Sequence, residues 1–369
     1  MKILQIVTQM EAAGAQRVAY LLGEELRNNG CDAELLFLYI KRPAYNSMRG
    51  VSSLLDHKPS FIDYLRIVIL LGRHLLRNKP DVLITHTHFA NILGQAMGFV
   101  CGVHNRIAVN HSPDTVYCRW ARRVDTFLGS VGVYSKIVAV SDSVVTSFSD
   151  YPRLYKRRIR VINNGVSVGA ESGMSPELRA ALGIPLTAPF IANVGRMSPQ
   201  KNQILLIRLL ALVPSLHLVI IGEGEERRTL VEIAESLSVA SRVHLTGELM
   251  PTDAFSIVRA SDIFVFPSRV EAMPMALIEA MLLEKPIVAS DIPACTEFLG
   301  EAGVLLPIDQ PEAWRSAIEQ LLTEPIKARL LGQRAREKAL RFTPEHMGES
   351  YLDLIERREI CHSAAVSMP

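Results

Sequence analysis

The sequence predicts an α/β protein of two domains, each built from a parallel β-sheet covered by helices. Short apolar runs alternate along the chain with longer amphipathic segments, which is the pattern of strands and crossover helices in parallel sheets. The 369 residues exceed what one hydrophobic core usually serves, and 49% of them are hydrophobic. Residues 169–189, rich in glycine, serine and proline, separate two such alternating series and form the expected linker.

The first series covers residues 1–168. Its predicted strands are short apolar runs bounded by turn-forming residues: Ile3 to Val7, Ala33 to Leu38, Val82 to Thr85, Arg106 to Val109, Ile137 to Val140 and Arg160 to Ile162. Helices are predicted between them, notably Ala15 to Asn28 and Phe61 to Asn78. Arg66 and Arg73 interrupt the second helix, so we expect a half-buried helix and no membrane span.

The second series covers residues 190–343. Its predicted strands are Phe190 to Val194, Leu216 to Ile221, Val243 to Thr246, Ile263 to Phe266, Ile287 to Ala289 and Val304 to Leu306. A last helix is predicted over residues 344–360. Ligands of doubly wound sheets bind outside the carboxyl ends of the strands, so we expect the functional site in a central cleft between the two halves.

Composition narrows the function classes. The chain has 40 basic and 38 acidic residues, a net charge of +2, which argues against a nucleic-acid-binding protein driven by bulk electrostatics. Five scattered cysteines without metal-ligand spacing fit reduced thiols in the cytoplasm. The apolar run at the N-terminus is too short for a signal peptide, so we expect a cytoplasmic protein.

Two glutamates stand eight residues apart in the segment PSRVEAMPMALIEAMLLEK, residues 267–285. Glu271 belongs to a loop after a predicted strand, and Glu279 belongs to the helix that Pro274 introduces. The unpaired N–H groups of such a helix start suit a phosphate, and Glu279 is placed to accept hydrogen bonds from sugar hydroxyls. Surface carboxylates that compensate a helix dipole are the structural alternative.

A second loop supports the phosphate hypothesis. Gly195 directly follows the apolar run Phe190 to Val194, and Arg196 and Lys201 place two cations at the start of the next helix. Two cations near one helix start indicate a diphosphate. The alternative is that these cations pair with nearby acids.

These two loops resemble the G-R-(x)4-K and E-(x)7-E motifs of retaining glycosyltransferases of family four, glycosyl transferases group 1, which have the GT-B fold. Further matching pieces are Ala13 to Val18, Asn110-His111, Val138 to Ser141, Asn164 to Val166, Gly222 to Gly224 and Gly247. The ordered set spans residues 2–345 and is far more specific than any single motif.

The resemblance implies transfer of a hexose or N-acetylhexosamine from a UDP-sugar or GDP-sugar to a hydroxyl of a glycan, a lipid-linked sugar or a small molecule, with the anomeric configuration retained. It implies that residues 344–360 pack back on the first, acceptor-side domain. It implies catalytic roles for His111, Glu271, Arg196 and Lys201, and donor binding by Gly14, Gly195, Arg196, Lys201, Gly222, Gly224, Met275, Ala276 and Glu279. No metal is expected, because no D-x-D motif stands where it would hold Mg²⁺.

The sequence departs from the family pattern at Ala13 and Ala272, where the family often has glycine. Each substitution adds a methyl group where backbone approaches phosphate or sugar, which concerns donor preference.

Two other segments have open interpretations. His86 and His88 alternate at a strand end, and structural roles are favoured over a metal site because no third ligand has suitable spacing. The basic, aromatic segment 119–131 is either an ordinary amphipathic helix or a peripheral contact with the inner face of the cytoplasmic membrane. The alternative functions are a nucleotide-sugar epimerase or hydrolase on the same fold, and a non-catalytic nucleotide-sugar-binding protein.

Overall fold

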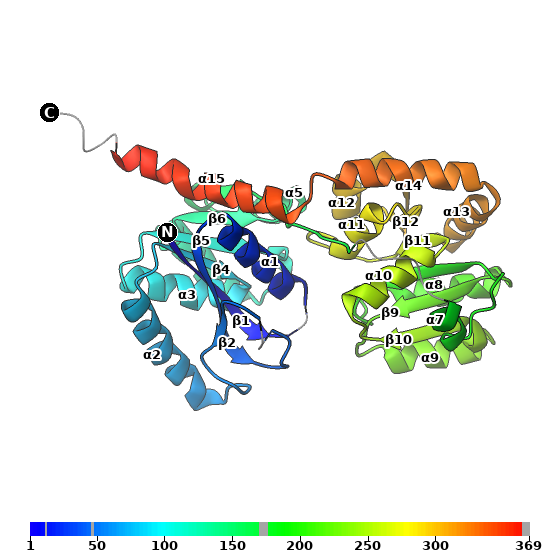
Figure 1. Cartoon of the computed structure of the whole chain (residues 1–369), viewed down its shortest axis with the longest axis horizontal. Coiled ribbons are helices and arrows are strands. Elements are labelled where there is room, and N and C mark those ends of the chain that lie inside the picture. Colours follow the sequence, from blue (N-terminus) through cyan, green and yellow to red (C-terminus); the bar gives the residue numbers. More distant parts are fainter. Residues whose placement is uncertain (12, 46–47, 170–175, 364–369) are drawn as a thin grey trace. The chain divides into compact units, whose positions relative to one another are not determined.

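The computed structural model describes residues 1–11, 13–45, 48–169 and 176–363, and the chain divides into two compact units (Figure 1). Unit 1 contains Met1–Gly165 and Phe342–Pro369, and unit 2 contains Val166–Arg341. The C-terminal segment therefore belongs with the N-terminal unit.

Unit 1 is built on a seven-stranded parallel sheet with the order β3-β2-β1-β4-β5-β6-β7. Its strands are β1 (Lys2–Met10), β2 (Asp32–Ile40), β3 (Val51–Ser53), β4 (Val82–His86), β5 (Asn105–Asn110), β6 (Lys136–Ala139) and β7 (Ile159–Val161). The six predicted strands are confirmed. Strand β3 was not predicted, because this three-residue edge strand is half-exposed and two of its residues are serines.

Helices cover both faces of this sheet, because right-handed crossovers that move in opposite directions from β1 put their helices on opposite faces. The helices are α1 (Gly14–Asn28), α2 (Phe61–Asn78), α3 (His88–Val100), α4 (Arg119–Ser130), α5 (Asp142–Ser147), α6 (Arg153–Lys156) and α15 (Pro344–Ser363). α15 packs against α1, whereas α2, α3 and α4 follow one another as neighbours. Strands β1 and β4 are thus buried on both sides.

Unit 2 has a six-stranded parallel sheet with the order β10-β9-β8-β11-β12-β13. Its strands are β8 (Phe190–Val194), β9 (His217–Ile221), β10 (Val243–Gly247), β11 (Ile263–Phe266), β12 (Ile287–Ser290) and β13 (Val304–Leu306). All of them were predicted, within one residue at each end. They carry the short apolar runs that sheets covered on both faces require.

The helices of unit 2 are α7 (Pro176–Ala181), α8 (Gln203–Leu212), α9 (Arg227–Ser236), α10 (Pro251–Ala260), α11 (Met275–Leu282), α12 (Pro293–Phe298), α13 (Pro311–Thr323) and α14 (Pro325–Ala339). α8 packs against α9 and α13, and α11 packs against α14. The core between α8, α13 and the sheet includes the fully buried Trp314, whose indole N–H donates to the Pro307 carbonyl at 2.9 Å.

The expected linker, 169–189, differs from the observed division at Gly165. Residues 170–175 of it lie outside the described residues, and the remainder contains α7. Arg179 of α7 donates to the carbonyls of Pro185 and Ala188 and lies 5.2 Å from the Phe190 ring centre. These contacts attach the segment to unit 2.

Candidate donor and histidine sites

Each sheet has a topological switch point at the carboxyl ends of its strands. At this point the loops that follow two neighbouring strands lead to helices on opposite faces of the sheet. In unit 2 this point lies between β8 and β11, and in unit 1 between β1 and β4. Loops that follow such strands diverge and leave room for a ligand at the carboxyl edge. The predicted loops 195–202 and 267–274 both start at the switch point of unit 2.

Backbone and side-chain hydrogen bonds hold these two loops together. The Arg269 N–H donates to the Gln200 carbonyl at 2.8 Å, and the Gln200 side chain donates back to the Val270 carbonyl at 2.8 Å. The Arg269 guanidinium donates to Asn202 Oδ1 at 2.9 Å. Asn202 stands before α8 in the left-handed conformation, with φ of 51°. Because asparagine tolerates this conformation well, the residue supports the turn that carries Lys201.

Lys201 and Glu271 meet across these loops. Lys201 Nζ lies 2.6 Å from Glu271 Oε1, and it lies 5.2 Å from the centre of the Phe266 ring. The two side chains are 20% and 9% exposed, so little water screens the pair. The alternative that loop cations pair with nearby acids is therefore observed for Lys201, and its partner is the glutamate of the other motif.

Arg196 has a different environment. Its side chain is exposed and forms no ion pair with any residue in the described part of the chain. The loop therefore carries one exposed guanidinium and one partly buried lysine that is paired with a carboxylate. Arg196 and Lys201 both belong to the loop at the carboxyl edge of the sheet, where they could bind an anion.

The start of α11 lies in the second loop. Met275 and Ala276 are the first two residues of this helix, and Pro274 precedes them. In the part of the chain that the structure describes, the N–H groups of Ala276 and Leu277 form no backbone hydrogen bond. Glu279 follows one turn later, and it is buried, with 8% exposure. A helix start with available N–H groups and a buried carboxylate offers both an anion site and an acceptor for hydroxyl groups.

The glycines of the first two loops in unit 2 allow backbone to pack on backbone. Gly222 has φ of +139°, and a Cβ there would lie 2.3 Å from the Gly195 carbonyl oxygen. A Cβ at Gly224 would lie 2.2 Å from the Met197 carbonyl oxygen. The Met197 N–H also donates to the Glu223 carbonyl at 3.2 Å. Close packing of two protein loops therefore requires glycine at 222 and 224 in this structure.

Gly14 opens α1 after β1 in unit 1. Among the described residues other than its chain neighbours, a Cβ at this position would meet no atom within 4 Å. Ala13 precedes it with extended backbone and supplies no side-chain cap to the helix. Packing within the protein therefore gives no reason for glycine at position 14, unlike at 222 and 224.

His111 follows β5, and it lies beside His86 at the end of β4. His86 Nδ1 is 3.0 Å from His111 Nε2, and His86 Nε2 is 2.9 Å from Gln5 Oε1. His86 is fully buried and His111 is partly buried. Burial lowers the pKa of His111 to about 4 and lowers the pKa of His86 well below its usual value, with His111 as a further cause. Both rings are therefore neutral at physiological pH.

Neither the role of Gln5 nor the contact between the two histidines was predicted from the sequence. His86 and His111 end neighbouring parallel strands, and this was the only signal that could have joined them. His88 turns away and stacks on the Tyr117 ring, with ring centres 3.8 Å apart. The alternating histidines thus have separate neighbours.

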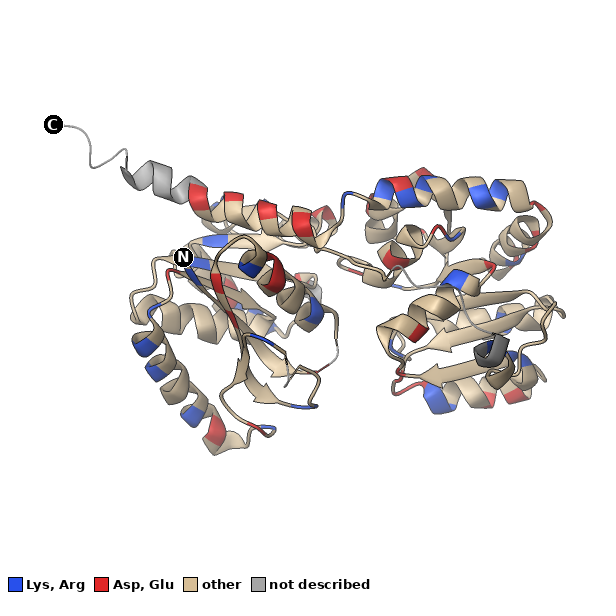
Figure 2. Cartoon of the chain, viewed as in Figure 1, with Lys and Arg blue, Asp and Glu red and all other residues tan. Residues whose placement is uncertain are grey.

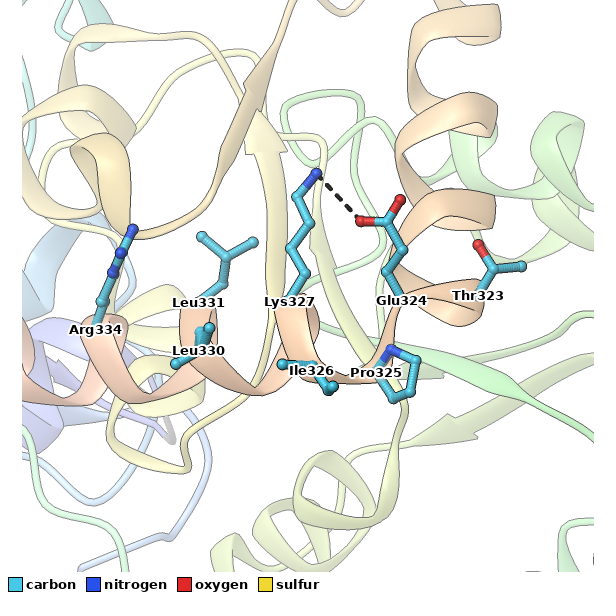
Figure 3. Close-up of a pocket in the computed structure, with 8 residues that line it drawn as sticks. All are labelled: Thr323, Glu324, Pro325, Ile326, Lys327, Leu330, Leu331 and Arg334. Carbon is cyan, nitrogen blue, oxygen red and sulfur yellow. Dashed lines mark ion pairs between the residues drawn. The ribbon is translucent and has the colours of Figure 1, made fainter.

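A pocket of 590 Å³ lies elsewhere in unit 2, along α13 and α14 (Figure 3). Its lining includes Ile326, Leu330 and Arg334, and Lys327 pairs there with Glu324 at 3.6 Å. It contains none of the predicted site residues. The candidate donor site is therefore at the loops of the switch point and not at this pocket.

Comparison with known proteins matches two family models to consecutive parts of the chain. Residues 12–169 match "Glycosyltransferase Family 4" and residues 174–338 match "Glycosyl transferases group 1". The chain belongs to these GT-B glycosyltransferases. The family membership and the GT-B fold expected from the sequence are thereby confirmed.

Individual relatives agree with the family. The lipopolysaccharide core biosynthesis glycosyltransferase LpsE of Rhizobium meliloti is 31% identical over 54% of this chain, and the match spans 58% of that protein. Alpha-maltose-1-phosphate synthase of Mycolicibacterium smegmatis is 26% identical over 77% of this chain and 81% of its own length. The crystal structure of Anabaena HepE in complex with UDP and glucose has a TM-score of 0.84 at 20% identity, and covers 97% of this chain and 100% of its own. At this identity the last comparison establishes the fold.

Proposed function

We propose that this GT-B protein is a retaining glycosyltransferase that moves a hexose or N-acetylhexosamine from a nucleotide diphosphate sugar to a hydroxyl of a glycan, a lipid-linked sugar or a small molecule. The observation that carries the proposal is the Lys201–Glu271 pair at the switch point of unit 2, beside the start of α11. A cation, a carboxylate and available N–H groups there suit a sugar diphosphate better than they suit an uncharged ligand.

In glycosyl transfer from a nucleotide diphosphate sugar, the enzyme mainly has to stabilise the negative charge on the leaving diphosphate. When the bond between the anomeric carbon and the diphosphate breaks, negative charge grows on the β-phosphate. In the proposal, Arg196, Lys201 and the N–H groups at the start of α11 stabilise that charge. We assign this role to fixed cations and dipoles, and no metal ion is part of the proposed mechanism.

The two glutamates have separate roles in the proposal. Glu271 holds sugar hydroxyls and offsets positive charge at the anomeric centre, and Glu279 accepts hydrogen bonds from the ribose. The donor displaces Lys201 from its ion pair with Glu271 as a phosphate oxygen becomes the new partner of the ammonium group. Retention of configuration follows from attack on the face that the diphosphate leaves, with the leaving phosphate helping to deprotonate the acceptor hydroxyl.

The proposed donor is a UDP-sugar or GDP-sugar. The fold relative HepE binds UDP and UDP-glucose in its crystal structures, which supports a UDP-sugar in particular. In the proposal, His111 of unit 1 contacts the transferred sugar or the acceptor hydroxyl, and Gly14 lets the first loop approach the donor.

A peripheral membrane contact is also part of the proposal, because the outer faces of α2, α3 and α4 expose large apolar side chains. Phe61 is 94% exposed, Phe99 54%, Trp120 67% and Phe127 64%. Figure 2 shows basic residues along α2, and α4 adds Arg119 and its neighbours. Because the three helices are neighbours, this face combines apolar anchors with cations, which suits an anionic lipid surface. No helix in the described ranges is long and apolar enough to cross a membrane.

The donor is tested by a thermal-shift panel of UDP, GDP, ADP and their sugars. We expect one nucleotide and its sugars to raise the melting temperature, because a ligand that binds only the folded state stabilises it by mass action. Incubation of that donor with and without candidate acceptors then separates transfer from hydrolysis or epimerisation. A melting temperature that no member of the panel changes contradicts the proposed function.

A further inference from the structure

The hydrogen-bonded Gln5–His86–His111 chain connects the core of unit 1 to a residue of the proposed site. Gln5 lies in the middle of β1, His86 ends β4 and His111 follows β5. Gln5 and His86 are both fully buried. The chain therefore starts in the buried interior and ends at a partly exposed ring.

With the Gln5 amide oxygen facing His86, as in this structure, only one arrangement of protons satisfies both hydrogen bonds of the chain. His86 is neutral because it is enclosed, so it carries one N–H and one lone pair. Gln5 Oε1 can only accept, so the N–H of His86 is on Nε2. His86 Nδ1 is then the acceptor, and His111 must donate to it from Nε2.

The amide of Gln5 acts through its oxygen in this structure. Its nitrogen is enclosed without a hydrogen-bond partner among the described residues. It lies beside α1 at Gly23, where an added Cβ would be 2.9 Å from it. The amide oxygen is thus the group that decides the tautomer of His86.

The other nitrogen of His111 is left for a ligand. No described residue forms a hydrogen bond with His111 Nδ1, and this atom is not among the enclosed polar atoms. A neutral imidazole that donates from Nε2 has a lone pair on Nδ1, so Nδ1 accepts and does not donate.

We propose that Gln5 and His86 are positioning residues that hold His111 as the neutral tautomer protonated at Nε2, so that Nδ1 accepts a hydrogen bond from a hydroxyl of the sugar or acceptor. The role of His111 toward substrate rests on the proposed function, whereas its tautomer does not. A site built this way favours a hydroxyl group over a carboxylate at the contacted position, because a lone pair that faces a carboxylate leaves both acceptors without a proton.

The tautomer is measured directly by long-range ¹H–¹⁵N correlation spectra of the imidazole side chains. The chain has 10 histidines, and the signals of His111 are assigned by their loss in His111→Gln. We expect Nε2 protonated and Nδ1 unprotonated in the ligand-free protein at neutral pH. The reverse pattern, with the proton on Nδ1, would overturn the proposal.

Two substitutions at His86 separate positioning from packing. His86→Leu keeps bulk but removes the acceptor, and we expect a mixture of His111 tautomers and a value of kcat/KM about tenfold lower. His86→Asn places an amide oxygen near the position of Nδ1, and we expect it to restore the tautomer and most of the lost rate. Equal losses in both variants, with the wild-type tautomer kept, would indicate a structural role only.

If His86→Leu does not fold, Gln5→Leu tests the same prediction. It removes the acceptor for His86 Nε2, and we expect the same mixture of His111 tautomers. Because the spectra require no substrate, the expected tautomer together with a failed nucleotide panel would refute the proposed function and the substrate contact of His111, and would leave the positioning of its tautomer by Gln5 and His86 intact.

Discussion

Lys201 and Glu271 are 70 residues apart in sequence, and their charged atoms lie 2.6 Å apart at the switch point of unit 2. Each belongs to a motif that suggested a phosphate or sugar role by itself. The ammonium group of Lys201 is therefore paired with a carboxylate in this structure. A diphosphate that binds there replaces one anionic partner with another, so the ammonium group is never left buried alone.

The first prediction concerns the two cations. Lys201→Ala and Arg196→Ala should each lower kcat by about 10²-fold, because each removes charge stabilisation from the leaving diphosphate. Initial rates with the donor found by the panel measure this effect. The matched control is Arg228→Ala, since Arg228 is an exposed arginine of α9 that pairs with Glu232. Unchanged turnover in both site variants would refute the assignment of the phosphate site.

The second prediction concerns Glu279, which is buried in α11. Glu279→Ala should weaken binding of the nucleoside diphosphate about tenfold, because a hydrogen bond to a charged acceptor contributes about 1.5 kcal/mol. Isothermal titration with the nucleotide measures the dissociation constant, and Glu232→Ala is the control. If Glu279→Ala lowers kcat and leaves nucleotide affinity unchanged, the ribose role is wrong.

The third prediction compares two glycines. Gly224→Ala should lower the melting temperature, because the new Cβ would lie 2.2 Å from the Met197 carbonyl oxygen. Gly14→Ala should keep the melting temperature of the protein without donor, because no described residue beyond its chain neighbours lies within 4 Å of the added Cβ. It should raise the donor KM about tenfold if backbone and donor approach each other there. A KM equal to that of the wild type would remove Gly14 from the donor site.

The fourth prediction concerns the pH dependence of stability through Asp125. This carboxylate is on the buried face of α4 and accepts hydrogen bonds from Tyr134 at 3.0 Å and Tyr155 at 2.8 Å. Burial raises the pKa of Asp125 to about 6, and the bonds from Tyr155 and Tyr134 act in the opposite direction. The folded pKa lies above the unfolded value of about 3.9, so this contribution is fully present below about pH 4 and is lost as pH rises through about 6.

Asp125→Asn removes this titration. The difference in unfolding free energy between wild type and variant should therefore change by about 2 kcal/mol between pH 4 and pH 7, with the wild type losing relative stability as pH rises. Urea unfolding at a series of pH values measures it. Other groups, such as His111, titrate in both proteins and cancel in the difference. Parallel curves would show that Asp125 does not titrate in this range.

The fifth prediction concerns the apolar face of α2, α3 and α4. Trp120→Ser together with Phe127→Ser should reduce binding to vesicles that contain anionic lipid, because both side chains are more than 60% exposed and would insert among the headgroups. Co-sedimentation measures the bound fraction. Ile326→Ser on α14 is the control, since this exposed apolar residue belongs to unit 2. If the double variant and the Ile326→Ser control bind the vesicles equally, a lipid contact at this face is contradicted.

Local sequence patterns predicted most of the fold. Phe190 to Val194, Ile263 to Phe266 and Val304 to Leu306 are strands with the predicted bounds, because a short apolar run between turn residues leaves few other structures. The three-residue strand β3 has no apolar run, and only its pairing with β2 defines it as a strand. The helix α7 falls within the segment that was predicted to be a linker. Arg179 attaches this helix to unit 2.

The candidate site divides in the same way. The sequence by itself determined that Lys201, Glu271 and His111 follow the carboxyl ends of strands, because local patterns locate strand ends and parallel sheets place those ends on one edge. Only the tertiary structure decided that Lys201 pairs with Glu271, that Gly224 packs on Met197, and that His86 joins Gln5 to His111. These contacts depend on strand order and on distances of a few ångströms between residues far apart in the chain, which no local pattern specifies.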